Sequence, residues 1–325
     1  MEVVTVLKCL ALISSFSFSI GKIPMYKLDP WWPGFPSVFT GPVYSAAVDD
    51  RQGVIYVSQR GDNVPPVLVF TVLGEYLRSF PYEPNVINMV HGMRMFHNDT
   101  SGETSLWLTD VGNGTLGHTV KSFSPTGTLE RVLGTSGKAG SGLAPLQFDQ
   151  VADIALSSDG EMFIVDGDGG VNNRLVKLQK DFQVAWHKGV NGTAAGQFHI
   201  PHSVELDGLG RVWVADRMNG RLQAFSAESG DFMGEWTSCF VNGEPYSVRL
   251  SADHTHFIVT QLQTNQILLV ASPQKPGLIG TCTVLDSIQL AEDIHPHLVA
   301  VSQLDGAFYV GELGSKACQK FLRVT

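Results

Sequence analysis

The chain lacks the features that would place it across a membrane, on a nucleic acid or among RING-type proteins. Only 4 of its 325 residues are cysteine, and no Cys/His spacing of the RING type occurs. The 31 acidic residues outnumber the 22 basic ones, and the formal net charge of -9 argues against nucleic acid, whose partners present basic patches. After the N-terminal segment, no apolar run is long enough to span a bilayer. We therefore expect a globular protein with no membrane span and no nucleic acid partner.

A phosphate-binding loop is also missing. The glycine-rich segment at residues 167–170 follows a predicted strand, but no helix opens after it. Nucleotide-binding loops need that helix, because its N-terminal N–H groups hold the phosphates. A nucleotide site is therefore not expected.

Residues 1–21 are expected to be a secretory signal peptide. The apolar stretch at residues 9–20 is too short for a transmembrane helix, and Ser17, Ser19 and Gly21 are small residues at plausible cleavage positions. The remaining residues, 22–325, are expected to form one domain. This arrangement predicts a secreted protein, located outside the cell or in the lumen of a secretory granule.

Short runs of alternating apolar and polar residues recur along this domain. The clearest unit is residues 198–225, where three such runs are separated by a glycine turn and an Asn219-Gly220 turn, which is typical of an antiparallel meander. A polar residue ends the second run of each unit, and we call these residues the strand-end anchors: Gln59, Asp110, Asp166, Asp216, Gln261 and Glu312. Six units of roughly 40 to 55 residues predict an all-β fold, a six-bladed β-propeller.

The expected blades are residues 42–84, 85–147, 148–196, 197–238, 239–292 and 293–325. The last blade has only three clear strands, and an open sheet edge is a liability. We therefore expect a strand near residues 25–28, within the segment 22–30, to complete that blade as its outer strand. Trp31 and Trp32 would then pack between blades as core aromatics.

Cys239 and Cys282 bracket the fifth blade and are expected to form a disulfide in an oxidising compartment, which leaves Cys318 unpaired. The alternative is that all three are buried thiols. Three Asn-X-Thr sequons in predicted loops indicate glycosylation, at Asn98, Asn113 and Asn191.

The repeat register places histidines at the start of the first strand in alternate blades. The residues at this position in blades one to six are Tyr44, His91, Ala152, His202, Tyr246 and His297. The histidines of blades two, four and six point toward the axis, and three imidazoles with an open fourth position are the arrangement of a catalytic Zn²⁺ site. The alternative is that they line the channel mouth and bond to water or backbone.

Arginines follow the strand-end anchors of blades one and four. Arg60 and Arg217 therefore face each other across the channel, where two guanidinium groups suit a carboxylate or another small anionic ligand. The alternative is that each pairs with a neighbouring acid such as Asp62 or Asp216. Tyr246 and His295 are further polar candidates near the same mouth.

The segments VADRMNGRLQAF and IVDGDGGVNNRLVKL resemble NHL repeats, and the similarity covers nearly the whole chain. The blades also resemble the peptidyl-hydroxyglycine α-amidating lyase, a six-bladed propeller with a tris-histidine zinc. Its zinc histidines lie in motifs matching VHG, IPHS and HPHL, which implies His91, His202 and His297 as ligands here. Its substrate-facing arginines lie in motifs matching QRGD and ADRMNGR, which implies Arg60 and Arg217.

The sequence departs from the lyase pattern at three places. The lyase motif SDGYCNSR, which carries the catalytic tyrosine, corresponds here to VDGDGGVNNR, which has no tyrosine. His295 replaces the methionine before the last zinc histidine, and Leu298 replaces the aspartate that binds calcium in the lyase. The resemblance therefore implies zinc but not calcium, and Tyr246, on another blade, is the remaining phenol that could act as a base.

Two classes of function follow. The first is a secreted binding module, expected to be monomeric, whose partner is a protein or a small anionic ligand and whose histidines hold a metal or are a relic. The second is a zinc-dependent lyase or hydrolase acting on a small carboxylate-bearing molecule, with Arg60, Arg217 and Tyr246 as catalytic candidates. We favour the first, because the metal site survives while the acid–base residue does not; the fold alone decides nothing here.

Overall fold

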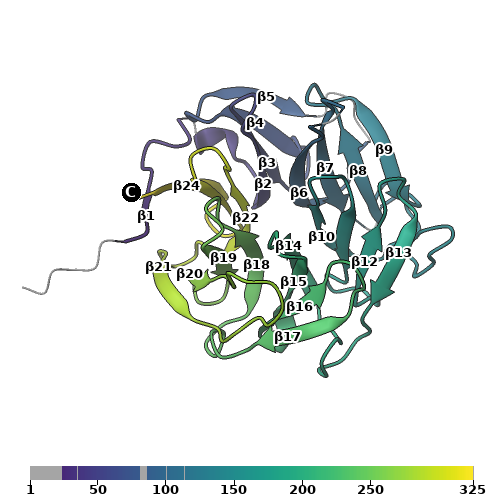
Figure 1. The fold of residues 1–325 in the computed structure, drawn as a ribbon. Coiled ribbons are helices and arrows are strands. Elements are labelled where there is room, and N and C mark those ends of the chain that lie inside the picture. The colour runs from purple at the N-terminus through teal and green to yellow at the C-terminus, as the bar shows by residue number, and fades with distance from the viewer. Residues whose placement is uncertain (1–23, 35, 81–85, 100, 113, 325) are drawn as a thin grey trace, which may run out of the picture.

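The computed structural model describes residues 24–34, 36–80, 86–99, 101–112 and 114–324. The predicted signal peptide lies outside these residues. Across the described ranges, strands β1 to β24 form six four-stranded sheets arranged as a ring about one axis (Figure 1). Two short 3-10 helices, η1 (Pro36–Val38) and η2 (Arg217–Asn219), accompany them, and no helix in these ranges has the length and apolarity to cross a membrane. The predicted fold class, a six-bladed β-propeller, is confirmed.

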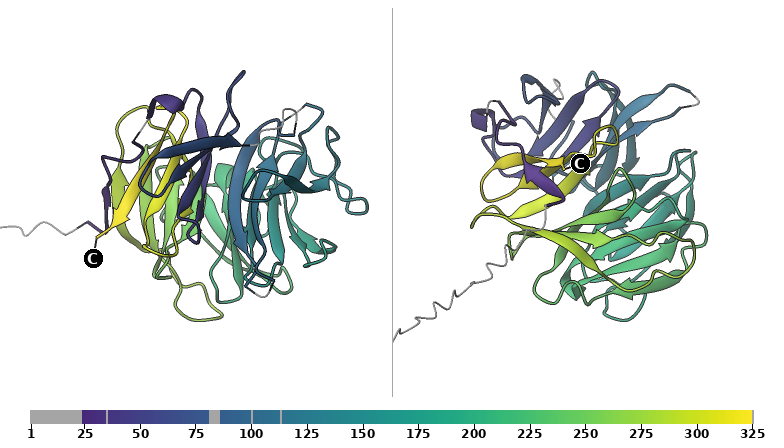
Figure 2. Two further views of the ribbon diagram at one scale, coloured as in Figure 1. Left: turned by 90° about the horizontal axis from the view of Figure 1, so that it is seen from above. Right: turned by 60° about the vertical axis from the view of Figure 1, so that its left-hand side comes forward.

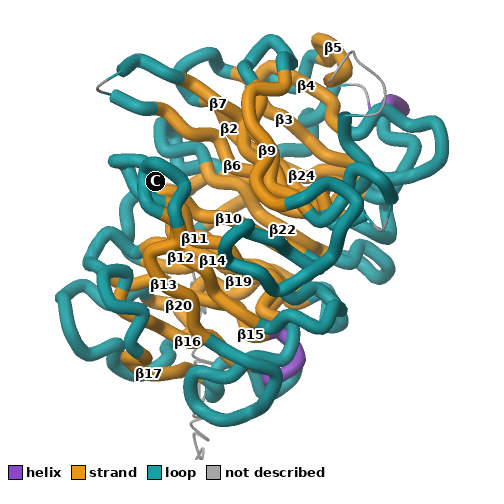
Figure 3. The backbone as a smooth tube through the Cα atoms, turned by 90° about the vertical axis from the view of Figure 1, so that its right-hand side faces the viewer, coloured by secondary structure: helices purple, strands orange, loops and turns teal. Residues whose placement is uncertain are grey.

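In blades one to five, the strands follow the chain order from the innermost to the outermost strand of an antiparallel meander. Figure 3 shows these strands joined by loops and turns. Blades one to three consist of β2 (Val43–Asp49), β3 (Val54–Gln59), β4 (Val67–Thr71) and β5 (Tyr76–Phe80); β6 (Val90–His97), β7 (Thr104–Asp110), β8 (Thr119–Phe123) and β9 (Leu129–Gly134); and β10 (Val151–Leu156), β11 (Met162–Asp166), β12 (Arg174–Leu178) and β13 (Val184–Lys188). Blades four and five consist of β14 (Pro201–Leu206), β15 (Arg211–Asp216), β16 (Arg221–Ser226) and β17 (Phe232–Trp236); and β18 (Pro245–Leu250), β19 (His256–Gln261), β20 (Gln266–Ala271) and β21 (Val284–Gln289).

Blade six contains strands from both ends of the chain. It consists of β22 (Pro296–Val301), β23 (Phe308–Glu312), β24 (Ala317–Arg323) and, as its outer strand, β1 (Tyr26–Leu28). Tyr26 lies opposite Arg323 and Leu28 opposite Phe321 in an antiparallel register, and Figure 2 shows the two terminal segments side by side. The predicted closure of the last blade by an N-terminal strand is therefore confirmed.

The hydrophobic core lies between the blades. The buried apolar side chains form six clusters, and each cluster joins two neighbouring blades. The second strand of each blade is buried on both faces, whereas an outer strand such as β9 is largely exposed. A blade alone would expose both faces of its sheet, so burial requires its neighbours and the ring is the stable unit.

Trp31 and Trp32 differ in their surroundings. Trp32 is buried between blades one and six, with its ring centroid 5.0 Å from that of Tyr309 and 5.8 Å from that of Phe70. Trp31 is 83% exposed, so its predicted place between blades is wrong. It lies in the turn after β1 and donates its backbone N–H to Asp29 Oδ1, and this turn directs the side chain into solvent.

The strand-end anchors are buried, and those of blades one to five connect the second strand to the segment that enters the same blade. Gln59 Oε1 accepts the backbone N–H of Gly41 at 3.2 Å, and the carboxylate of Asp110 accepts those of Asn88 at 2.9 Å and Met89 at 2.6 Å. Buried N–H groups in a loop need such acceptors. This need explains why a polar residue recurs at the end of an otherwise apolar strand.

Glu312, the anchor of blade six, is less well satisfied. Its Oε2 accepts a hydrogen bond from the Ser315 hydroxyl, but its buried Oε1 has no partner among the groups the structure describes. Burial therefore raises the pKa of Glu312 to about 7, because the charged form loses its hydration.

Replacement of Glu312 by Gln should stabilise the fold at alkaline pH. The folded pKa of about 7 lies above the unfolded value, so the wild-type free energy of unfolding falls as pH rises from about 4.5 to 7 and then levels off. The neutral amide escapes this loss, which amounts to up to about 3 kcal/mol. Urea unfolding of the wild type and of Glu312→Gln at pH 5 and pH 8 measures the free energy of unfolding. An equal pH dependence in the two proteins would contradict the raised pKa of Glu312.

The structure joins Cys239 to Cys282 in a disulfide, with 6.0 Å between their Cα atoms, and leaves the buried Cys318 free. The predicted pairing is confirmed. Cys239 lies in the connection from β17 to β18, and Cys282 lies just before β21. The bond therefore ties the link between blades four and five to the edge of blade five, and both sulfurs pack against the cluster those blades share.

Replacing both Cys239 and Cys282 with Ser should lower the free energy of unfolding by roughly 3 to 4 kcal/mol, because the disulfide closes a long loop in the unfolded chain. Denaturant unfolding of the double variant gives the loss, with Cys318→Ala as the cysteine control. Mass mapping of non-reduced peptides checks the pairing, and a cross-link that includes Cys318 would contradict it.

Candidate metal centre

Three histidines meet at the axis. His91, His202 and His297 lie near the starts of β6, β14 and β22, and each is at most 2% exposed. Their ring centroids are 4.8, 4.8 and 4.9 Å apart, and their ligand nitrogens all lie within 4.8 Å of one another. The register that linked these distant residues in the sequence brings them together in space, and the cluster could hold a metal ion.

Each imidazole is held by the backbone of the next blade. The Nδ1 atoms of His91, His202 and His297 lie 2.7, 2.6 and 2.8 Å from the carbonyl oxygens of Ala152, Tyr246 and Tyr44. These acceptors occupy the same register position in blades three, five and one, so imidazoles and carbonyls alternate around the ring. A carbonyl can only accept, so Nδ1 carries the proton and Nε2 is left with its lone pair. Metal-binding histidines are oriented in this way.

Burial keeps His202 and His297 neutral. Burial lowers the pKa of His202 to about 3, with further lowering from His91 and Arg217, and burial together with the neighbouring rings holds the pKa of His297 well below its usual value. The Nε2 of His202 is buried and accepts no hydrogen bond among the described residues. Lowered pKa values at His202 and His297 and the unpartnered Nε2 of His202 fit a metal ion, which needs deprotonated nitrogen ligands.

A carboxylate, that of Asp168, also reaches the histidines. Asp168 follows β11, and its Oδ2 lies 3.1 Å from His91 Nε2, while its Oδ1 lies 3.9 Å from His202 Nε2 and 3.3 Å from Arg217 Nη1. Burial acts to raise the pKa of Asp168, but His91, His202 and Arg217 together hold it well below its usual range. The sequence reasoning missed this residue. It lies one position beyond the arginine register, and extending the register by that position would have found it.

Both predicted arginines lie beside the cluster, and neither pairs with Asp62 or Asp216. Arg60 Nε donates to the carbonyl of Val90 at 2.7 Å, and its guanidinium lies 3.5 Å from the centroid of the Tyr44 ring. The Arg217 guanidinium contacts Asp168 and lies 4.8 Å from the Tyr246 ring. Asp216 instead forms an ion pair with Arg221.

Tyr246 packs on the histidines but is unsuited to act as a base. Its ring centroid lies 5.0 Å from that of His202, and Gln263 Nε2 donates to its hydroxyl at 3.1 Å. Burial raises the pKa of Tyr246, so the phenol keeps its proton at neutral pH. His295 stays outside the cluster, and its backbone N–H is donated to Asn265 Oδ1 at 2.7 Å.

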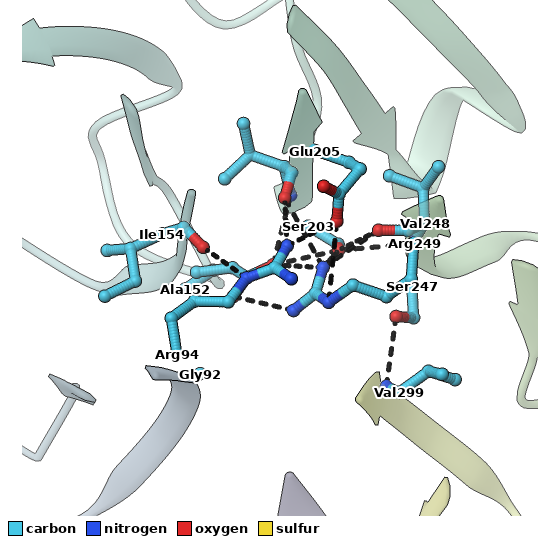
Figure 4. Close-up of polar contacts among 12 residues, drawn as sticks. Gly92, Arg94, Ala152, Ile154, Ser203, Glu205, Ser247, Val248, Arg249 and Val299 are labelled. Atoms are coloured by element: carbon cyan, nitrogen blue, oxygen red, sulfur yellow. Dashed lines mark hydrogen bonds and ion pairs between the residues drawn. The ribbon is translucent and has the colours of Figure 1, made fainter. Parts of the chain in front are cut away.

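Further along the first strands lies a group of bonded polar side chains, which we call the channel-floor network: Arg94, Asp153, Ser203, Glu205 and Arg249. Figure 4 shows Arg94, Ser203, Glu205 and Arg249 of this network. Arg249 donates to Asp153 Oδ1 at 3.0 Å and to Ser203 Oγ at 2.7 Å. Arg94 donates to Glu205 Oε2 at 2.6 Å beside a cavity of about 640 Å³. The network places two guanidinium groups close together, which disfavours binding of a second cation beside them.

Replacing Arg249 with Met should lower the free energy of unfolding by about 3 to 5 kcal/mol, because Asp153 is fully buried and would lose its ion partner. The double variant Arg249→Met/Asp153→Asn should recover part of the loss. Arg94→Met is the control and should cost less, since Glu205 is partly exposed. Thermal and denaturant unfolding measure all three; a loss below about 1 kcal/mol for Arg249→Met would contradict a buried ion pair.

Comparison with known proteins extends this description. No family model matches the chain. Mouse NHL repeat-containing protein 3 is 47% identical over 318 residues, which cover 97% of this chain and 90% of the mouse protein. The chain belongs to the NHL repeat-containing protein 3 family.

The chain is also similar, at lower sequence identity, to two other proteins. Mouse peptidyl-glycine alpha-amidating monooxygenase is 27% identical over 339 residues, which cover 89% of this chain but 31% of that enzyme. A solved structure of streptogramin B lyase matches with a TM-score of 0.63 at 14% identity, covering 92% of this chain and 98% of the other. At that identity the match supports the propeller fold alone.

Proposed function

We propose that this member of the NHL repeat-containing protein 3 family is a secreted, monomeric binding propeller that carries Zn²⁺ on His91, His202 and His297. The observation that carries the proposal is the convergence of three buried imidazoles, each with Nδ1 bonded to a backbone carbonyl. Nitrogen ligands suit zinc, whereas calcium takes oxygen ligands. The residue after His297 is the buried and apolar Leu298, which also speaks against calcium.

Bound zinc would supply a fixed positive charge near the channel axis and would link three alternate blades. The chain's own residues would do the rest. Arg60 Nη2 and Arg217 Nε are buried donors with no hydrogen-bond partner among the described residues. Unused guanidinium donors beside the channel mouth suit a carboxylate, either of a small molecule or of an acidic side chain on a protein partner.

Secretion and glycosylation form part of the proposal. The Cys239–Cys282 disulfide supports an oxidising compartment, because such bonds are rare in the cytosol. Asn191 is exposed in the loop after β13, and Asn98 is half-buried in the loop between β6 and β7, so both sequons lie on loops as glycosylation requires. The third predicted site, Asn113, lies outside the described residues.

Protein purified from the medium of secreting cells should contain about one equivalent of zinc by elemental analysis. His202→Ala should lose most of it, because one of three nitrogen ligands is removed. His199→Ala is the matched control, since this exposed histidine lies three residues earlier in the chain and outside the cluster. Circular dichroism establishes that the variants are folded. Native protein without stoichiometric metal would contradict the proposal.

A zinc-dependent lyase acting on a small carboxylate-bearing molecule is the second candidate. Arg60 and Arg217 beside the histidines favour it, as does the similarity to an enzyme named for peptide amidation. The raised pKa of Tyr246 and the absence of a tyrosine in the loop after β11 argue against it. Turnover of a peptidyl α-hydroxyglycine by the zinc-loaded protein, lost in Tyr246→Phe, would establish the lyase in place of the binding module.

A further inference from the structure

We propose that Asp168 is the fourth ligand of the channel metal, so that three histidines and one aspartate form a closed centre for a divalent transition metal ion. This inference rests on the proposed zinc site and adds to it the ligand that fills the position left open by the three histidines. The carboxylate belongs to blade three, which contributes no histidine to the cluster.

The distances suit a shared cation. Asp168 Oδ2 lies 3.1 Å from His91 Nε2, and Oδ1 lies 3.9 Å from His202 Nε2. Two atoms that bind one zinc at about 2.0 to 2.2 Å are roughly 3.3 to 3.5 Å apart when the site is tetrahedral. The Oδ2–His91 separation is close to this value, so this oxygen and the His91 nitrogen can bind one ion after a small side-chain shift.

The orientation of the side chains also suits a shared ion. His91 uses Nδ1 for the carbonyl of Ala152, and its Nε2 lies 3.1 Å from Asp168 Oδ2. The buried Nε2 of His202, which has no hydrogen-bond partner among the described residues, lies 3.9 Å from Oδ1 of the same carboxylate. The Nε2 atoms of two histidines and one carboxylate therefore lie together at the axis.

Arg217 supplies a positive charge to only one oxygen of the Asp168 carboxylate. Arg217 Nη1 lies 3.3 Å from Oδ1, so Oδ2, the oxygen near His91, is left for the metal. Arg217 therefore acts as a positioning residue that orients the carboxylate, as hydrogen-bonding partners of metal ligands commonly do. The same ion pair occupies part of the guanidinium that would otherwise bind an external anion.

The glycine-rich segment at residues 167–170 holds Asp168 in place. The backbone N–H groups of Gly167 and Asp168 both donate to the carbonyl of Gln150 at 2.8 Å. A Cβ at position 167 would lie 2.5 Å from the carbonyl oxygen of Asn172, and Gly169 has φ +81°, so both positions require glycine. This segment, which does not fit a phosphate-binding loop, fits the presentation of one carboxylate to the axis.

A closed site has a functional consequence. Structural zinc sites have four protein ligands, whereas catalytic sites keep one position for water or substrate. With Asp168 bound, an external ligand reaches the arginines without reaching the metal. Coordination by Asp168 would therefore favour a structural metal in a binding module over a catalytic metal in a lyase.

The test uses the full-length protein loaded with Co²⁺, whose visible absorption reports coordination, and azide as an exogenous ligand. Wild-type protein should bind one equivalent, and its spectrum should not change with azide. Asp168→Ala should bind zinc at least about tenfold more weakly in a chelator competition, and azide should change its cobalt spectrum. The matched control is Asp62→Ala, because Asp62 is an exposed carboxylate in the corresponding loop of blade one. It should behave as wild type.

The outcomes separate this inference from the proposed function. Failure of the wild-type protein to bind zinc or cobalt would overturn the metal site and, with it, the role of Asp168. Tight binding in both wild type and Asp168→Ala, with the same azide response, would leave the histidine site intact and overturn only the fourth ligand. Asp168→Asn provides a folded, isosteric variant if the alanine protein is unstable, and it should show the same opening to azide.

Discussion

Closure of the ring between blades six and one is the constraint on which the other features depend. The pairing of β1 with β24 completes blade six and places β22 against β2. At that seam His297 Nδ1 bonds the carbonyl of Tyr44, and Gly311 packs on the Tyr44 backbone so closely that a Cβ would lie 2.9 Å from its carbonyl carbon. The third metal-ligand candidate is therefore oriented by a contact between the first and the last blade. A ring left open would lose that contact along with the core cluster that the two blades share.

Two polar layers with opposite electrostatic character follow each other along the first strands. The layer at the strand starts presents imidazole lone pairs and the Asp168 carboxylate, and it favours a cation. The next layer contains the guanidinium groups of Arg94 and Arg249 (Figure 4). They form ion pairs with Glu205 and Asp153, respectively. Buried charges of this kind persist only when they are paired. The histidine layer could therefore hold a metal ion, whereas in the next layer the positive charge comes from the arginine side chains themselves.

The parts of the site that sequence reasoning found share one property, a fixed place in the repeat. The histidines and both arginines occupy equivalent strand positions in different blades, so a one-dimensional register is sufficient to relate them. Asp168 lies in a loop, where the register continues for only a residue or two before blade-specific turns begin. The partner of Arg217 escaped prediction for a related reason. It is Asp168, a residue of the neighbouring blade, whereas the predicted partners were acids close in sequence.

The sequence by itself determined the number of blades, the strand that closes the ring, the disulfide and the three residues that meet at the axis. These follow from local alternation, from the spacing of equivalent positions and from the need to satisfy a sheet edge. Only the tertiary structure decided that Trp31 faces solvent, that imidazoles alternate with carbonyls around the axis and that Asp168 faces the histidines. Those features depend on the direction of individual side chains and on contacts between blades. Repeat periodicity carries no information about either, because it records where a residue lies along a strand and not which group of another blade it meets.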